Sequence, residues 1–308
     1  MRASRLTLPL AVAAAFSLAA CGGSSSTSPT DGGTAGGGES APVAGGDGGA
    51  CDGATDLLKE ICERGEIKVS TDPAYPPQSS LNDQTGEYEG FDIDVATEIA
   101  KRLGVNVGWE APNWDVITAG SWNGRWDMTV GSMTPTNDRQ KVLFFTQPYN
   151  YTPAVVVVRA DDTAVNDLAN DLDGKTIGVC SGCTYDDFLN KKLNIEGYTF
   201  DFIIDDAKVT GYDTDTTALQ DLANGRIDAA ITSVTTAQGY IDAGNPVKIV
   251  GDPVFYEPLS VGFDRSSSSS AESLFEVVDK IVGEMHADGT LTEFSEKWYG
   301  SDLTKKKE

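Results

Sequence analysis

The chain has 308 residues, of which 47 are acidic and 23 are basic, giving a formal net charge of −24. A surface this acidic repels nucleic acids and anionic lipid headgroups, which excludes both as binding partners. The hydrophobic content of 40 % supports a packed core, and the length allows two ordinary domains.

Residues 1–50 have the composition of a targeting segment followed by a tether. A basic start precedes the apolar run 6–20, which is too short to span a membrane, so residues 1–20 are predicted to be a signal peptide. The run ends in "LAAC", which resembles the lipobox of bacterial lipoproteins and implies that Cys21 is lipidated. An ordinary cleaved signal peptide is the alternative. Residues 22–50 are rich in Gly and Ser and are predicted to be a flexible tether with a reach of about 30 Å.

The four other cysteines lie in two local pairs. Cys51 and Cys62 flank a short helix-like segment, and Cys180 and Cys183 form a CxxC motif. Because a signal peptide implies an oxidising compartment, we predict the disulfides 51–62 and 180–183. A zinc site is disfavoured because the single histidine, His286, lies far along the chain. A thioredoxin-like redox role is the alternative for the CxxC motif.

From residue 66 onward, short β-rich runs alternate with helical patterns, which is typical of the α/β class. The predicted strands, in chain order, are 67–70, 105–109, 126–133, 175–179, 198–204 and 227–232. The predicted helices are 91–103, 114–122, a short one after Thr136, 184–193, 215–225 and 234–241.

Two further extended runs, 152–161 and 258–265, separate two similar α/β units, and an amphipathic helix follows the second run. If this helix covers the first unit, the chain crosses twice between two lobes and forms a two-strand hinge; periodicity alone leaves this topology open. The expected boundaries are 51–154 for the first lobe, 155–257 for the second, and 258–308 for a return to the first.

The segment "GSMTPTNDR" (131–139) places Arg139 in the first turn of a predicted short helix. A helix N-terminus carries partial positive charge and disfavours a cation there. An anion bound from outside the chain would make Arg139 favourable at this point. The alternative is an ordinary surface ion pair with Asp138 or Asp115.

The segment "GEYEGFDIDVATEIAKRLG" (86–104) resembles the signature of the bacterial extracellular solute-binding proteins of family 3. Other segments match in order, among them "GEIKVSTDPAYPP", "WDMTVGSMTPTNDRQKVLFFTQPY" and "MHADGTLTEFSEKWYG", so that the resemblance runs from about residue 62 to 300. It implies the type II periplasmic-binding-protein-like fold: two α/β lobes, two connecting strands, and a ligand cleft between the lobes. Hinge closure around the ligand is the expected motion.

The resemblance also implies a set of binding residues. Arg139 would form a bidentate pair with a ligand carboxylate, supported by Ser132, Thr134 and backbone N–H groups of the same loop. From the other lobe, Cys183 and Thr184 would approach the same carboxylate at a second helix N-terminus.

Tyr75 and Trp114 occupy the positions of the aromatic residues that enclose the ligand side chain. The remaining tryptophans, Trp109, Trp122 and Trp126, are expected to be packing residues.

Two positions depart from the family pattern. Gln78 stands where an aromatic residue is common, which favours either a polar ligand tail or a rearranged loop. Ser233 stands where an aspartate usually binds the α-ammonium of the ligand, and a serine supplies no counter-charge. Asp213 or Asp215 could substitute for that aspartate; otherwise the ligand carries a carboxylate and no primary α-amine.

The resemblance implies the capture subunit of an ABC importer for an amino acid or a related small carboxylate. The expected protein is a monomer, anchored by its lipid to the outside of the bacterial cell membrane, with membrane permease subunits as partners. It is expected to have no catalytic residues, no cofactor and no metal. Two alternatives are a ligand-sensing subunit for a membrane receptor and a cyclic-acid dehydratase. The dehydratase would need a cleft acid or base with a tuned pKa, and no clear acid–base pair emerges.

Overall fold

The computed structural model describes residues 49–306 of the protein. The predicted signal peptide (1–20), the predicted lipidation site Cys21 and nearly all of the predicted tether lie outside the described residues. Within the described range, no helix is both long enough and apolar enough to cross a membrane.

Helices and strands alternate along most of the described chain. The helices are α1 (Asp56–Arg64), α2 (Phe91–Leu103), α3 (Trp114–Thr118), α4 (Thr184–Leu189), α5 (Asp215–Ala223), α6 (Val234–Asp242), α7 (Glu272–Ala287) and α8 (Thr290–Tyr299), with the 3-10 turn η1 (Arg139–Lys141). The strands are β1 (Glu66–Ser70), β2 (Ala74–Tyr75), β3 (Ser79–Leu81), β4 (Tyr88–Glu89), β5 (Asn106–Glu110), β6 (Met128–Met133), β7 (Leu143–Phe145), β8 (Asn150–Arg159), β9 (Thr176–Cys180), β10 (Lys208–Tyr212), β11 (Ala229–Ser233) and β12 (Val247–Asp264).

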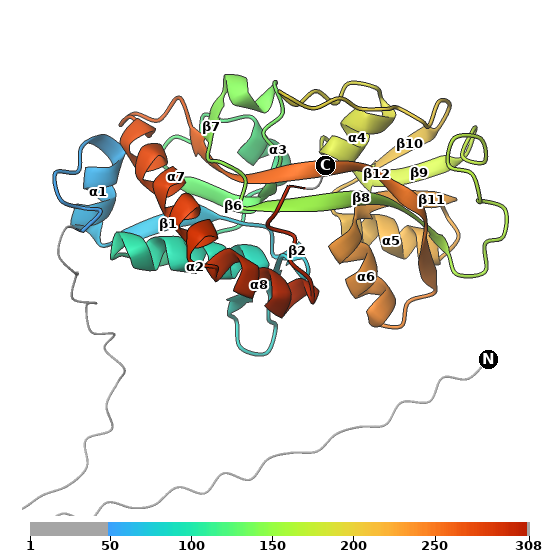
Figure 1. The fold of residues 1–308 in the computed structure, drawn as a ribbon, viewed down its shortest axis with the longest axis horizontal. Helices are drawn as coiled ribbons and strands as arrows, with labels where there is room; N and C mark the ends of the chain where they lie inside the picture. The colour runs from blue at the N-terminus through green and yellow to red at the C-terminus, as the bar shows by residue number, and fades with distance from the viewer. Residues whose placement is uncertain (1–48, 307–308) are drawn as a thin grey trace, which may run out of the picture. The chain divides into compact units, whose positions relative to one another are not determined.

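Two long strands connect the two lobes. Strands β8 and β12 pair antiparallel, from Asn150 opposite Leu259 to Arg159 opposite Val247. They are the central strands of one continuous sheet, in the order β10-β9-β11-β8-β12-β6-β1-β5, with β7 paired to β12. Figure 1 shows both strands running across the middle of the molecule from one lobe to the other. The predicted pair of crossing segments is therefore present, and β12 begins earlier than the predicted run.

The sheet of the second lobe is buried on both faces. Along β8, Ala154, Val156 and Val158 pack into one core cluster. Val155 and Val157 pack into another. Because successive side chains of a strand point to opposite faces, a continuous run of valines fits a strand that is covered on both sides.

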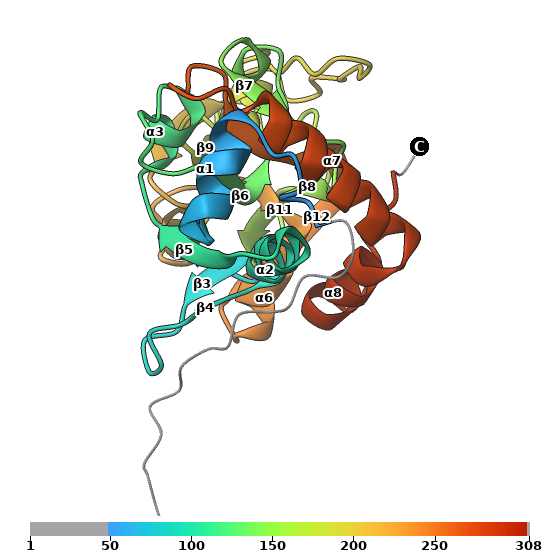
Figure 2. The same cartoon turned by 90° about the vertical axis from the view of Figure 1, so that its left-hand side faces the viewer.

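The first lobe buries the helix that follows β12. On α7, the buried face consists of Leu274, Val278, Ile281, Val282 and Met285. This face joins one core with residues of α1, α2, β1 and β6. Figure 2 views this lobe and shows α1, α2 and α7 around the strands. The helix after the second crossing therefore covers the first unit.

The predicted strand 198–204 is not a strand. The edge of the second-lobe sheet is formed instead by β10, which pairs parallel with β9. The alternating aromatic residues of the predicted strand pack against the lobe by their side chains. The ring centre of Phe202 lies 5.4 Å from that of Phe188, and the ring centre of Phe200 lies 5.8 Å from that of Phe255. An alternation of apolar and polar residues can thus arise in an irregular segment whose side chains contact the core, without any backbone pairing in a sheet.

The predicted helix 114–122 is shorter than expected. Helix α3 ends at Thr118, and Gly120 follows with a φ of +67°, a conformation that ends a helix. Trp122 is completely buried beyond this turn, where its indole N–H donates to the carbonyl of Ile117. The apolar residue at position 122, which suggested a longer helix, therefore contacts the core from beyond the end of α3.

Both predicted disulfides are present. Cys51 pairs with Cys62 beside α1, and Cys180 pairs with Cys183 between β9 and α4.

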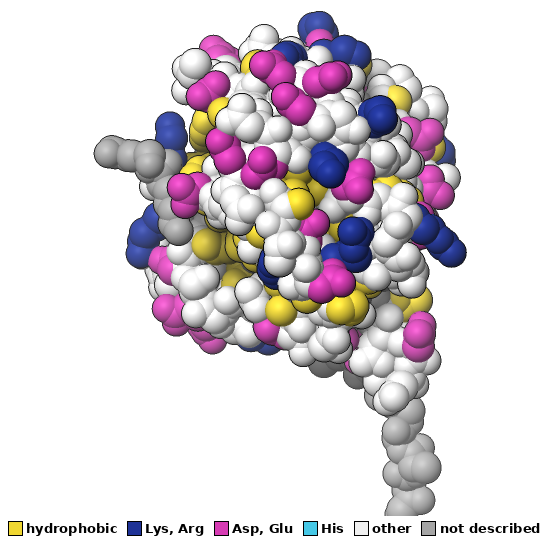
Figure 3. Space-filling view, turned by 90° about the vertical axis from the view of Figure 1, so that its right-hand side faces the viewer, with side chains coloured by type: hydrophobic (Ala, Val, Ile, Leu, Met, Phe, Trp, Pro, Cys, Tyr) yellow, Lys and Arg dark blue, Asp and Glu magenta, His cyan; other side chains and the backbone are white. Residues whose placement is uncertain are grey.

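On the outer face of the second lobe, Figure 3 shows acidic and basic side chains interspersed over a largely polar surface.

Candidate functional site

A pocket lies where the two lobes meet. It collects residues from the ends of β1, β6, β9 and β10, from the starts of α3, α4 and α5, and from β12. Its lining consists of Asp72, Tyr75, Trp114, Gly131, Ser132, Thr134, Arg139, Cys180, Ser181, Cys183, Thr184, Tyr185, Asp213, Thr214, Asp215 and Glu257. All predicted ligand-binding residues except Ser233 are therefore brought together.

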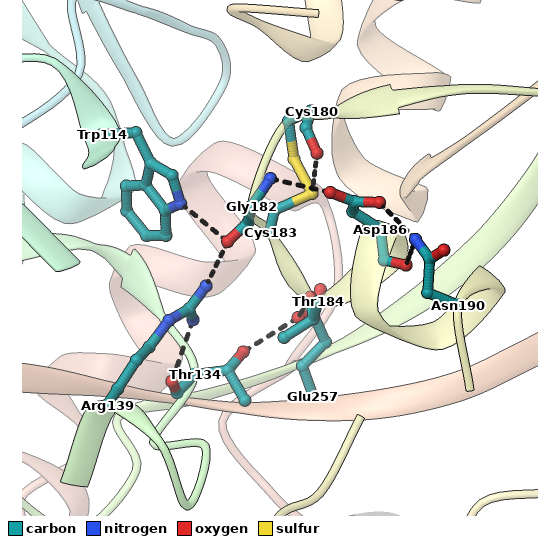
Figure 4. The surroundings of a disulfide bond; sticks show 10 residues. All are labelled: Trp114, Thr134, Arg139, Cys180, Gly182, Cys183, Thr184, Asp186, Asn190 and Glu257. Carbon is teal, nitrogen blue, oxygen red and sulfur yellow. Dashed lines mark hydrogen bonds between the residues drawn. A yellow bond between two sulfur atoms is a disulfide. The ribbon is translucent and has the colours of Figure 1, made fainter. Parts of the chain in front are cut away.

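Arg139 is a buried cation in this pocket. Its guanidinium donates through Nη1 to the carbonyl of Thr134 (3.0 Å) and through Nη2 to the carbonyl of Gly182 (3.1 Å), as Figure 4 shows. The guanidinium also lies 5.0 Å from the ring centre of Trp114. Among residues 49–306, no carboxylate lies within salt-bridge distance of Arg139. The surface ion pairs considered for Arg139 with Asp138 and Asp115 are thus not formed.

The electrostatic state of Arg139 reflects this environment. Burial lowers its pKa from the ordinary arginine value to about 10, and the negative charges of Asp187 and Glu257 only partly oppose this effect. The guanidinium stays charged at neutral pH because its pKa remains far above 7. An anion entering the pocket would meet a partly desolvated cation with unused hydrogen-bonding capacity.

The short helix predicted after Thr136 is present, but only as a 3-10 turn. Arg139–Lys141 form a single 3-10 turn, and β7 begins two residues later. The backbone N–H of Arg139 donates to the Thr136 side-chain oxygen and does not point into a free helix N-terminus. Burial of the guanidinium, and not a helix dipole, therefore sets the preference for an anion.

The opposite wall of the pocket is the disulfide-bonded turn before α4. Cys183 occupies the N-cap position of α4, and its disulfide bond to Cys180 fixes the turn whose Gly182 carbonyl faces the first lobe (Figure 4). The indole N–H of Trp114 also donates to this carbonyl, at 3.4 Å. Arg139 and Trp114 of one lobe thus converge on one backbone oxygen of the other.

Glu257 is a pocket residue that sequence reasoning missed. It lies on β12 with 4 % of its surface exposed. Its carboxylate accepts hydrogen bonds from the hydroxyls of Thr134 (2.9 Å) and Thr184, which come from different lobes. Burial raises the pKa of Glu257, and the hydroxyl donors oppose that rise. The available signal was an acidic residue directly before the predicted extended run 258–265.

Two further predicted residues have additional partners. Ser132 has a φ of +50° and donates its hydroxyl to Asp92 (2.8 Å) behind the pocket. Asp92 is fully buried, and this burial raises its pKa to about 7. Tyr75, on β2, lines the pocket beside the acidic residues. The side-chain hydroxyl of Ser132 therefore supports the wall of the pocket.

The remaining tryptophans pack as predicted. Trp122 and Trp126 are buried together in one small core, and Trp109 packs against the large core of the first lobe.

The structure does not bring Ser233 into the pocket. Its hydroxyl caps α6 by accepting the Thr236 N–H (3.2 Å), and it accepts a hydrogen bond from the Gln78 side chain (3.0 Å). Gln78 is almost completely buried and also donates to Thr235 and Thr236. The two departures from the family pattern, Gln78 and Ser233, therefore contact each other across the lobes.

The pocket is rich in acidic side chains. Asp72, Asp213, Asp215 and Glu257 all line it. In the described part of the chain, no group of three or more His, Cys, Asp or Glu side chains is arranged to hold a metal ion. The pocket is thus suited to a small molecule that carries both an anionic and a cationic group.

Comparisons with known proteins agree with this geometry. Residues 67–301 match the family described as "Bacterial extracellular solute-binding proteins, family 3". The L-cystine-binding protein TcyJ of Escherichia coli (strain K12) is 31% identical over 250 residues, covering 81% of this chain and 88% of TcyJ. The L-cystine-binding protein TcyA of Bacillus subtilis (strain 168) is 32% identical over 266 residues, covering 85% and 92%.

The solved structures include an ancestral arginine-binding protein bound to arginine, which is 32% identical with a TM-score of 0.66. The match covers 77% of this chain and 99% of that protein. The predicted α/β fold with two lobes is confirmed by these likenesses.

Proposed function

The chain belongs to the bacterial extracellular solute-binding proteins of family 3, and on that basis we propose that it is the capture subunit of an ABC importer for an amino acid. Its family places it outside the cytoplasm, and its relatives are binding proteins, in agreement with the prediction that it is not an enzyme. The relatives named for L-cystine and the arginine-bound ancestral structure support an amino acid as the ligand class.

The observation that carries this proposal is the buried guanidinium of Arg139. A buried cation without a carboxylate partner is unfavourable unless another anion reaches it. Arg139 lines a pocket between lobes and presents a planar fork that matches a carboxylate. Trp114 and Tyr75 supply aromatic surfaces beside it for the rest of the ligand.

Capture would proceed by closure of the lobes about the two crossing strands. The proposed boundaries are 51–154 and 258–308 for the first lobe and 155–257 for the second, so that β8 and β12 form the hinge. Hydrogen bonds between the lobes, from Gln78 to Ser233 and from Arg139 to Gly182, fit a closed arrangement. The closed form would then dock on membrane permease subunits and release the ligand to them.

Attachment to the membrane is part of the proposal. The lipobox-like sequence supports a lipidated Cys21, and the Gly/Ser-rich tether would let the binding domain reorient near the permease. Changing Cys21→Ser should move the protein from the membrane fraction to the soluble fraction. Retention of that variant in the membrane fraction would contradict lipid anchoring.

Calorimetric titration of the full chain with the common L-amino acids and L-cystine tests the binding function. At least one should bind with a micromolar or tighter Kd, and Arg139→Ala should weaken it strongly. Arg226→Ala is the matched control, because Arg226 is exposed and pairs with Asp221 away from the pocket. Equal affinities for the two variants, or no binding by any amino acid, would contradict the proposal.

A further inference from the structure

Acidic side chains outnumber basic ones in the pocket. Asp72, Asp213, Asp215 and Glu257 line it together with a single cation, Arg139. A carboxylate ligand adds one more negative charge to this set. A second cationic group in the same pocket would therefore stabilise the bound state.

Asp215 stands out among these acids. It is the first residue of α5 and has 6 % of its surface exposed. Within the described part of the chain, its Oδ1 atom has no hydrogen-bond partner. A buried carboxylate oxygen without a donor is unfavourable, so this atom is suited to accept from a donor that comes with the ligand.

The helix does not use the Asp215 side chain as its cap. Thr214 caps α5, since its hydroxyl accepts the Thr217 N–H at 3.1 Å. Arg139 does not neutralise Asp215 either, because no salt bridge joins these two side chains among the described residues. Asp215 is left with like charges, from Glu257 and Asp72.

We infer that Asp215 binds the protonated amine of the ligand and thereby selects zwitterionic amino acids over carboxylates that lack an amine. Arg139 would hold the carboxylate, and Asp215 would hold the ammonium at the other side of the same pocket. The inference rests on the proposed function and adds the residue that determines the class of substrate.

Ser233 is not available for this role. Its hydroxyl is occupied by the cap of α6 and by Gln78, and it lies outside the pocket lining. A hydroxyl also carries no charge to offset a desolvated ammonium. Asp215, at the start of the neighbouring helix α5, carries the negative charge that Ser233 lacks.

The surroundings of Asp215 link amine binding to pH. Burial, together with the negative charges of Glu257 and Asp72, raises its pKa to about 7, while the Thr232 hydroxyl opposes the rise. The groups that face Asp215 are Asp72 after β1, Tyr75 on β2, Tyr185 on α4, Thr232 on β11 and Glu257 on β12. The tyrosines stay neutral, because burial raises the pKa of each well above 10.

An ammonium must displace the proton of Asp215 below about pH 7, so affinity for an amino acid should fall by up to about tenfold per pH unit there. A carboxylate without an amine should show no such fall, because protonated Asp215 repels it less.

The test uses two pairs of probes that differ only in the α-amines. L-arginine is compared with 5-guanidinopentanoic acid, and L-cystine with 3,3′-dithiodipropanoic acid, by calorimetric titration of the full chain. Asp215→Asn should weaken binding of the amino acid by roughly 30-fold or more, as for loss of one partner of a buried charge pair. The same variant should bind the amine-free acid at least as well as the unchanged protein, which also shows that it is folded.

Asp242→Asn is the matched control. Asp242 is the next acid after Ser233, but it is exposed on α6 and accepts from Gln238 outside the pocket. This variant should bind every probe as the unchanged protein does.

The outcomes separate the two proposals. If the amino acids bind and Asp215→Asn changes neither their affinity nor its fall below about pH 7, the role of Asp215 is wrong while the binding function stands. Equal or tighter binding of the amine-free acids by the unchanged protein also refutes amine selection and leaves a carboxylate-binding function. If no amino acid and no amine-free acid binds, both proposals fail.

Discussion

Replacing Arg139 tests the origin of ligand affinity most directly. Burial lowers the pKa of Arg139 from its ordinary value to about 10, and this drop corresponds to roughly 3 kcal/mol at about 1.36 kcal/mol per pKa unit. This is the approximate free energy that burial removes from the charged form when no anion is bound. A ligand carboxylate that pairs with the guanidinium recovers much of it, in addition to two hydrogen bonds.

We therefore expect Arg139→Ala to weaken binding of an amino acid by about 3 kcal/mol, within the usual range of about 2–5 kcal/mol for a truncated buried pair. This loss is about 150-fold in Kd. Arg139→Lys keeps the charge and loses the planar fork, so it should fall between the unchanged protein and the alanine variant.

The stability of the unliganded protein supplies an independent readout. The alanine variant loses hydrogen bonds to the carbonyls of Thr134 and Gly182, but it also loses an uncompensated buried charge. These effects oppose each other, so the free energy of unfolding should change by no more than about 1 kcal/mol. Calorimetric titration gives the affinity, and urea unfolding without ligand gives the stability.

A loss of affinity below tenfold would refute Arg139 as the carboxylate anchor. The reasoning would also be refuted if the alanine variant lost so much free energy of unfolding that this loss accounts for its whole loss of affinity. In that case the arginine would serve the fold and not the ligand.

Gln78→Leu should weaken amino-acid binding several-fold through loss of inter-lobe hydrogen bonds, and small-angle scattering should show a more open protein; an unchanged affinity would contradict this role. Replacing Cys51 and Cys62 by serine should lower the free energy of unfolding by about 3 kcal/mol, as expected for closing a short loop, with ligand affinity unchanged in titrations. For Asp92, burial raises the pKa to about 7, so the folded state holds a proton that the unfolded state releases above its own lower pKa. The free energy of unfolding should thus rise as pH falls from about 7 to about 4. In chemical unfolding, Asp92→Asn should reduce the dependence of this free energy on pH by about 1.4 kcal/mol per pH unit. An unchanged pH dependence would show that Asp92 is ionised in the folded protein.

Local patterns in the sequence determined much of the architecture. The helix predicted at 91–103 has the bounds of α2, because its apolar spacing and a glycine at each end are local signals. The valine run of β8 and the amphipathic face of α7 were recognisable for the same reason. The pattern failed at 198–204, where alternating aromatic residues contact a core without pairing in a sheet.

The site was only partly contained in the sequence. Arg139 could be singled out because a cation is unfavourable at the predicted helix N-terminus. In the structure, the preference of Arg139 for an anion comes from its burial and not from a helix dipole. The roles of Gln78, Ser233 and Glu257 could not be read in this way. Gln78 meets Ser233 across 155 residues, and Glu257 meets Thr134 across 123.

Only the packing of the lobes decides which polar groups are buried and which of them lack a partner. Asp213 and Asp215 are two residues apart and chemically identical, yet Asp215 is buried and Asp213 is exposed. The sequence reduced the candidates for the proposed ammonium partner to a few acids. The tertiary structure separates them, because desolvation and unpaired hydrogen-bonding atoms arise from contacts between distant segments and have no local signature.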